Sequence, residues 1–328
     1  MRILPVALFF IVLVIPLMTA SASSAQSADL LRHFTYDPKV SLDIKESGVE
    51  QRGEIGIHDI SYASPKGGHV PAYLVVPEGK GPFAAVIWGH WYMEGSAFRN
   101  RKEFLDEAVV LAHAGVISLL PDGPVARPGH VENNAPLNEQ DPVELVHSIV
   151  DMRRGADLLL ARKDVDAKRL AYVGHSYNAK VGGILSGIDP RFKAFVLMAG
   201  DMSDAVGFRS REYQDFRQNV GPEKFDAYVA RYSWLDTGKY VSHAAPATVL
   251  LQYASQEKFL NADRAKEYAA VVSEPKMLRI YDAPHALNAE ARHDRIAFLV
   301  AQLHLHAPDP ALLASVPDLV QPPDPPKQ

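Results

Sequence analysis

Residues 169–183 read RLAYVGHSYNAKVGG. An apolar run typical of a buried strand ends at the Gly-His-Ser of this stretch, and a run with helical character follows at once. A strand, a tight turn and a helix in that succession can present a serine as a nucleophile, so we expect this role for Ser176. Gly174 matches the first glycine of the pattern G-x-S-x-G, whereas Asn178 occupies the place of the second. The alternative is that Ser176 only caps the N-terminus of an ordinary helix.

Further apolar runs extend this pattern along the chain. They cover residues 83–90, 115–123, 192–200, 247–255 and 276–285. Continuous Val, Ile and Leu runs of this kind suit strands that are buried on both faces of a parallel sheet. Segments with helical periodicity separate several of them, most clearly at residues 101–115, 141–164 and 288–303. The alternation predicts a doubly wound, mostly parallel α/β sheet with right-handed crossovers.

Several segments lie outside this alternation. Residues 58–64 and 69–79 read as an N-terminal antiparallel hairpin around a Lys-Gly-Gly turn. Residues 201–245 are too many for a simple crossover and are rich in aromatic side chains, so we expect a small helical lid there. Residues 307–328 hold seven prolines and predict an extended or disordered tail. These limits leave residues 26–306 as the folded α/β domain.

The N-terminus has the layout of a secretory signal. Arg2 precedes an apolar run over residues 3–18, and small residues follow up to Ala25. The apolar run contains two prolines and is shorter than the roughly 20 residues that span a bilayer. We therefore expect residues 1–25 to be a cleaved signal peptide and the protein to be exported, either to the periplasm or as a secreted protein. A retained membrane anchor is the alternative.

Composition argues against several classes of function. Hydrophobic residues make up 47% and charged residues 22% of the 328 residues, which suits a chain with a large core. The formal net charge of −5 and the pI near 6.2 do not favour binding to nucleic acid or to an anionic membrane surface. The chain has no cysteine, which excludes disulfides, thiolate catalysis and Cys-ligated zinc, and no pattern indicates another metal site or a cofactor.

Polar residues follow several of the predicted strands, and the carboxyl ends of the strands form the functional edge of a parallel sheet. A serine nucleophile needs a base within hydrogen-bond reach that is oriented by a third group. We expect His285, which follows the last predicted strand, to be the base. Glu257, in the loop after the preceding strand, is the expected acid that receives the Nδ1–H of this histidine. Asp201 is the alternative acid.

The oxyanion that forms during attack on an ester requires two preorganised N–H donors. We expect one from the backbone of Tyr177, directly after the serine, and the other from Trp91 or Tyr92. The side chains of Trp91, Tyr92, Met93 and Tyr177 are also candidates for lining a substrate pocket; packing beneath the lid is the alternative for the first three.

The order Ser176, Glu257, His285 along the chain resembles that of the α/β-hydrolase superfamily. More narrowly, the chain resembles the dienelactone-hydrolase-like and acetyl-xylan-esterase-like branch of this superfamily. The similar segments are LLPDGPVARPG, DMRRGADLLLARKDVDAKRLAYVGHSYNA, LLQYASQEKF and YDAPHALNAEARHDRIAFL. The resemblance covers most of residues 55–304 and implies the α/β-hydrolase fold, with these residues as nucleophile, acid and base. Glu in place of Asp and Asn178 in place of Gly depart from the family pattern. Dienelactone hydrolases proper use a cysteine nucleophile, so their activity is not implied.

These observations favour an exported serine hydrolase that cleaves carboxylic esters through an acyl-enzyme, with a small-molecule ester as substrate. A non-catalytic module of the same fold that binds a ligand or partner is one alternative, which Asn178 supports. A peptidase or amidase with the same triad is another. Arg99 and Arg127 are expected in surface or structural ion pairs, with contact to an acidic substrate as the alternative. The sequence does not choose among acyl chain, alcohol, sugar and peptide.

Overall fold

The computed structural model describes residues 30–200, 203–257 and 260–322 of the chain. Within these residues a single nine-stranded sheet forms the centre of the molecule. Its strands are β1 (Lys45–Arg52), β2 (Ile55–Ala63), β3 (His69–Val76), β4 (Phe83–Gly89), β5 (Val116–Pro121), β6 (Val165–His175), β7 (Ala194–Met198), β8 (Thr248–Ala254) and β9 (Lys276–Tyr281). Each apolar run that the sequence marks as a strand overlaps one of β4 to β9, so these strands are confirmed. The expected burial on both faces is wrong for β9, which lies at the edge of the sheet and is only partly buried.

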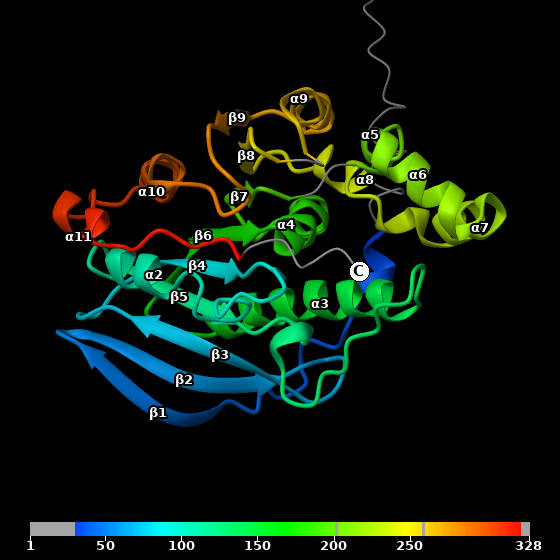
Figure 1. The fold of residues 1–328 in the computed structure, drawn as a ribbon. Coiled ribbons are helices and arrows are strands. Elements are labelled where there is room, and N and C mark those ends of the chain that lie inside the picture. Colours follow the sequence, from blue (N-terminus) through cyan, green and yellow to red (C-terminus); the bar gives the residue numbers. More distant parts are fainter. Residues whose placement is uncertain (1–29, 201–202, 258–259, 323–328) are drawn as a thin grey trace, which may run out of the picture.

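The sheet is mostly parallel and runs in the order β1-β2-β3-β5-β4-β6-β7-β8-β9. The strands from β5 and β4 through β9 pair in parallel. β1, β2 and β3 are antiparallel to one another, and β3 joins them to β5. Figure 1 shows these antiparallel strands, in blue, along one edge of the sheet. The predicted doubly wound sheet with an antiparallel hairpin, here β2 and β3, is therefore confirmed.

Helices cover both faces of the sheet. The helical elements are η1 (Arg32–Phe34), α2 (Leu105–Ala112), η2 (Pro124–Ala126), α3 (Gln140–Leu160), α4 (Tyr177–Ile188), α5 (Asp204–Gly207), α6 (Arg211–Val220), α7 (Pro222–Tyr232), η3 (Ser233–Leu235), α8 (Gly238–Val241), α9 (Ala262–Val271), α10 (Ala289–Leu303) and α11 (Pro310–Ala314). One apolar core lies between the sheet and α3, α4, α8 and α9, and a second lies between the sheet and α2 and α10. The two cores make the sheet a rigid frame for the loops at its edge.

The strand β1 was not predicted. Its sequence, KESGVEQR, has no apolar alternation, and all of its residues except Arg52 are exposed. The strand forms at the edge of the sheet because its backbone pairs with β2. Hydrophobic periodicity carries no signal for a strand that buries neither face.

The C-terminal tail contains the short helix α11, which departs from the expected extended or disordered chain. Asp309 caps this helix by accepting a hydrogen bond from the Ala311 N–H, and Pro310 occupies the first turn. Arg292 of α10 donates to the carbonyl oxygen of Pro317 at 3.1 Å. The described part of the tail is thus held on the body of the domain by specific contacts.

Residues 203–245, the described part of the expected lid, consist mainly of the short helices α5 to α8. We call them the lid segment. α6 buries none of its residues, and α7 buries only Phe225. The ring of Phe225 contacts those of Phe208 and Phe216 at centroid distances of 5.4 and 6.0 Å. Figure 1 shows α6 and α7 outside the layers that cover the sheet.

The expected signal peptide, residues 1–25, lies outside the described residues. In the part of the chain that is described, we find no helix of sufficient length and apolar character to cross a membrane.

Candidate active site

Ser176 lies in the sharp turn between β6 and α4. Its backbone angles, φ 56° and ψ −114°, belong to a conformation that residues with a side chain rarely adopt. Two glycines make room for the turn. A Cβ on Gly174 would lie 2.1 Å from the carbonyl oxygen of Asn178, and a Cβ on Gly200 would lie 2.1 Å from that of Ser176. The turn is therefore strained and tightly enclosed by backbone, and the serine side chain lines a cavity.

Asn178 takes the place of the second glycine of this turn. Its side chain is fully buried, and its Nδ2 donates to the carbonyl oxygen of His90, just after β4, at 2.6 Å. Tyr172 donates through its hydroxyl to the backbone carbonyl of Asn178 at 2.9 Å. The space comes from Gly89, because a Cβ there would lie 2.6 Å from the Cβ of Asn178. A glycine in the neighbouring strand thus compensates for the one missing from the turn, and Asn178 ties the turn to the loop after β4.

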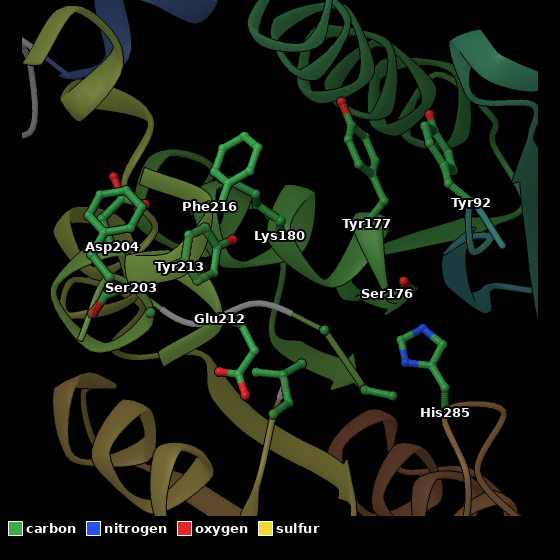
Figure 2. A pocket seen from close by; sticks show the side chains of 15 residues that line it. Tyr92, Ser176, Tyr177, Lys180, Ser203, Asp204, Glu212, Tyr213, Phe216 and His285 are labelled. Atoms are coloured by element: carbon green, nitrogen blue, oxygen red, sulfur yellow. The ribbon is translucent and has the colours of Figure 1, made fainter. Parts of the chain in front are cut away.

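His285 and Glu257 lie in contact beside the serine. Nδ1 of His285 is hydrogen-bonded to Oε1 of Glu257, and the two side chains are 14% and 10% exposed. They meet because they follow β9 and β8, which are neighbouring parallel strands. His285 and Ser176 line the same cavity, and Figure 2 shows the imidazole next to the serine hydroxyl. The structure therefore brings together the three residues that the sequence singles out, while the alternative acid, Asp201, lies outside the described residues.

The candidate oxyanion donors differ in their surroundings. Tyr177 is the first residue of α4, so its N–H has no acceptor within the helix. The Trp91 N–H donates to Oε2 of Glu103 at 2.5 Å and is not available to a substrate. The expectation that Trp91 supplies a donor is therefore wrong, because a buried side chain accepts its hydrogen. Tyr92 and Tyr177 are left as candidates, and their rings stack with centroids 4.1 Å apart. Both side chains are labelled in Figure 2.

Two of the four expected pocket residues line the cavity, and two do not. Tyr92 and Tyr177 line the cavity. Trp91 is fully buried, and its ring stacks with the imidazole of His175 at a centroid distance of 5.1 Å. Met93 is half-buried and is not among the residues that line the cavity. Trp91 and Met93 are therefore wrong as pocket residues. Trp91 packs behind the site against the imidazole rings of His175 and His285, rather than beneath the lid.

The cavity has a volume of about 640 Å³ and lies between the serine turn and the lid segment. The lid segment and α4 supply lining residues that the sequence did not reveal, namely Lys180, Ser203, Asp204, Gly207, Phe208, Glu212, Tyr213 and Phe216. Burial raises the pKa of Asp204, and the ammonium group of Lys180 offsets part of this shift. A signal for Lys180 exists, since a residue four positions after Ser176 in a helix lies on the same face. The lid residues have no comparable spacing.

Other polar residues near the strand ends have structural partners. His90 is buried between the Gly123 N–H, which donates to Nε2, and the Trp91 carbonyl, which accepts from Nδ1, both at 2.8 Å. Burial lowers the pKa of His90 to about 4, so the ring is neutral near pH 7. Arg99 and Arg127 form ion pairs with Glu132 and Asp151, as the sequence favours. Within the described residues, no group of three or more His, Cys, Asp or Glu side chains is arranged to hold a metal ion.

The sequence matches no protein-family model and no curated protein. Solved structures are similar in fold. An acetyl xylan esterase from Paenibacillus sp. R4 is 19% identical, with a TM-score of 0.63 over 86% of this chain and 93% of that protein. Acetyl xylan esterase 1 from Thermoanaerobacterium sp. JW/SL YS485 is 15% identical, with a TM-score of 0.65 over 85% of this chain and 93% of that protein. A glucuronoyl esterase from Solibacter usitatus is 14% identical, with a TM-score of 0.59 over 87% and 93%. With the sheet order and the serine turn described above, these likenesses show that the protein has the α/β-hydrolase fold.

Proposed function

We propose that this protein hydrolyses carboxylic esters, with Ser176 as nucleophile, His285 as general base and Glu257 as the acid that orients the base. One observation carries the proposal: the Nδ1 of His285 contacts the Glu257 carboxylate beside a serine in a strained turn, on the wall of one cavity. A nucleophile, a base and an orienting group are the requirements for nucleophilic catalysis by serine. The structural neighbours named above are esterases, which supports the same reaction class.

The geometry suits the steps of acyl transfer. Glu257 accepts the Nδ1 hydrogen of His285, which leaves the lone pair on Nε2 for the proton of the Ser176 hydroxyl. The serine oxygen attacks the ester carbon, and the N–H groups of Tyr92 and Tyr177 stabilise the negative charge on the former carbonyl oxygen. His285 then gives its proton to the leaving alcohol. Water, deprotonated by the same base, attacks the acyl group on the serine and releases the carboxylic acid.

The cavity favours a polar ester of moderate size as substrate. Its volume of about 640 Å³ lies within the range of about 300–1,000 Å³ that is typical of small-molecule sites. The rings of Tyr92 and Tyr177 offer flat apolar surface next to the serine, while Lys180 and Glu212 offer charged groups. Two of the structural neighbours are named acetyl xylan esterases. We therefore include acetylated sugars among the proposed substrates.

Ester turnover by the mature protein and by Ser176→Ala tests the proposal. The substrates are p-nitrophenyl esters of increasing acyl length and an acetylated xylo-oligosaccharide. We expect turnover by the wild-type protein and a loss of at least about 10³-fold in the variant. Equal turnover by both proteins would contradict the role of Ser176. A folded wild-type protein without turnover would instead favour the non-catalytic binding module, and preferential cleavage of peptide p-nitroanilides would favour a peptidase.

We also propose that the protein is exported after removal of a signal peptide. The support is the succession of Arg2, an apolar run and small residues up to Ala25. Mass spectrometry of the protein from the periplasm or the medium should find a new N-terminus near this alanine. Full-length chain confined to the membrane fraction would contradict the proposal and favour an uncleaved anchor.

A further inference from the structure

A second histidine–glutamate pair lies directly behind the first. Nδ1 of His175 is 2.5 Å from Oε1 of Glu103, and the two side chains are 0% and 2% exposed. We call these two residues the buried dyad. The rings of His175 and His285 are stacked, with centroids 5.2 Å apart. Neither member of the buried dyad lines the cavity that contains Ser176, so neither can contact a substrate there.

The buried dyad connects the loops that carry the proposed site. Oε2 of Glu103 accepts the backbone N–H of Trp91, in the loop after β4. Nε2 of His175 lies 3.0 Å from the carbonyl oxygen of His285, in the loop after β9. His175 itself immediately precedes Ser176. We call the loop after β4, which carries Trp91 and Tyr92, the oxyanion loop. One chain of hydrogen bonds thus runs from the oxyanion loop, through the serine turn, to the loop after β9 that carries His285.

The hydrogen-bond partners restrict the protonation of the buried dyad. The carbonyl of His285 only accepts, so Nε2 of His175 carries a hydrogen. Its Nδ1 then either accepts a hydrogen from Glu103 or is itself protonated. Burial lowers the pKa of His175 to about 4 and raises that of Glu103 well above its usual range. The nearby charges of Glu107 and Arg295 form an ion pair with each other. Both directions favour the neutral state, in which Glu103 keeps its proton and donates it to Nδ1 of His175.

A neutral dyad also suits the base in front of it. In the proposed reaction His285 becomes an imidazolium while it holds the proton of Ser176. A second positive ring stacked at 5.2 Å would oppose that charge. The neutral His175 avoids this repulsion, and its hydrogen bond to the His285 carbonyl still restrains the loop.

We propose that Glu103 and His175 are positioning residues, which as a neutral dyad hold the oxyanion loop and the loop of His285 in register with Ser176. This inference rests on the ester hydrolysis proposed above. A displacement of about 1 Å of a reacting group can cost about 10²-fold in rate. Loss of the dyad is therefore expected to lower kcat more than it changes KM, because the dyad does not contact the substrate.

Two substitutions of Glu103 provide the test, with kcat and KM measured on the p-nitrophenyl ester that the wild-type protein cleaves best. In Glu103→Gln the amide oxygen can accept the Trp91 N–H and the amide nitrogen can donate to Nδ1 of His175, as the protonated carboxyl does. We expect kcat within about threefold of wild type. Glu103→Leu leaves both partners without a hydrogen bond, and we expect kcat to fall about 10- to 100-fold with a smaller change in KM.

His175→Phe is a second route to the same result if Glu103→Leu does not fold. The phenyl ring keeps the stack and loses both hydrogen bonds, so we expect the same fall in kcat. A loss in Glu103→Gln as large as in Glu103→Leu would overturn the neutral state. Wild-type kcat in folded Glu103→Leu or His175→Phe would overturn the positioning role. Absence of turnover by the wild-type protein, measured in parallel, would overturn the proposed function instead.

Discussion

Two histidine–glutamate pairs stand one behind the other in this protein, with their imidazole rings 5.2 Å apart. In both pairs the Nδ1 of the histidine contacts a glutamate oxygen. His285 lines the cavity, and the side chains of His285 and Glu257 are partly exposed, whereas those of His175 and Glu103 are almost fully buried. The two pairs thus have the same residue types and the same contact, but they differ in their exposure to solvent.

This difference decides what each pair can do. In the proposed reaction, Glu257 accepts the Nδ1 hydrogen of His285 and stabilises this histidine when it gains a proton. In the rear pair, burial favours the uncharged forms of both groups, because it lowers the pKa of His175 and raises that of Glu103. The front pair is therefore suited to proton transfer, and the rear pair, together with Asn178 and His90, is suited to fixing the backbone around it.

The largest expected effect is on the front histidine. His285→Gln should reduce kcat about 10⁴-fold, because the variant lacks the imidazole that takes the serine proton in the proposed reaction. The fold should be preserved, since the side chain lies at the cavity wall. The measurement is kcat on the ester used above, alongside His175→Phe. A greater loss in His175→Phe than in His285→Gln would invert the comparison of the two pairs.

Matched glutamate substitutions give the next effect. In Glu257→Gln the amide cannot stabilise the imidazolium form of His285, and we expect kcat to fall about 10²- to 10⁴-fold. Glu103→Gln, with the same chemical change in the buried dyad, should stay within about threefold of wild type. Circular dichroism of both variants controls for folding. Equal losses of kcat in the two variants would show that the two pairs do not have different roles.

The packing behind the site can be tested by a double-mutant cycle of Gly89 and Asn178. Gly89→Ala places a methyl group 2.6 Å from the Cβ of Asn178 and should lower the free energy of unfolding by about 1–3 kcal/mol. Asn178→Gly removes the hydrogen bond to the His90 carbonyl and should cost a similar amount. In the double variant the methyl group no longer meets the side chain of Asn178, although it still lies 2.6 Å from the hydroxyl of Tyr172. The cost of the double variant should therefore be smaller than the sum of the two single costs. Strictly additive costs, measured by urea unfolding, would contradict the proposed compensation.

The smallest effect concerns pH and the buried His90. Its pKa is about 4 in the folded protein and about 6.5 in an unfolded chain, so the unfolded state takes up a proton first as the pH falls. Stability is therefore lost between about pH 6.5 and pH 4, by about 1–2 kcal/mol from pH 7 to pH 5. His90→Asn should reduce this pH dependence, and His293→Gln, a change at an exposed histidine, should not. Equal pH dependence in all three proteins would contradict a neutral buried His90.

Much of the frame could be predicted because it leaves strong signals in the sequence. The strands β4, β5, β7 and β8 and the second half of β6 are buried on both faces, and this burial requires the continuous apolar runs. The edge strand β9 is only partly buried. The contact of Glu257 with His285 could be anticipated because both residues follow neighbouring parallel strands. The contacts of single polar atoms could not be predicted from the sequence. The Trp91 N–H is bound by Glu103, a residue twelve positions further on, and no periodicity encodes that bond.

The role of Asn178 shows the same limit. In the sequence it is a departure from the pattern around Ser176, and its compensation by Gly89 is visible only when β4 and β6 lie side by side. Likewise, the lid segment is recognisable by length and aromatic content, but which of its residues face the cavity depends on how its short helices pack. Local propensity predicts elements; the contacts between elements require the fold.

The most direct test of the central claim is covalent labelling of the serine. The wild-type protein and the variants Ser176→Ala, His285→Gln and Glu103→Gln are treated with a fluorophosphonate, digested and analysed by mass spectrometry. The account predicts rapid modification of Ser176 in the wild-type protein and in Glu103→Gln. It predicts slow modification in His285→Gln and none at this position in Ser176→Ala. A folded wild-type protein that stays unlabelled, or is labelled at another residue, would contradict the assignment of Ser176 as the nucleophile.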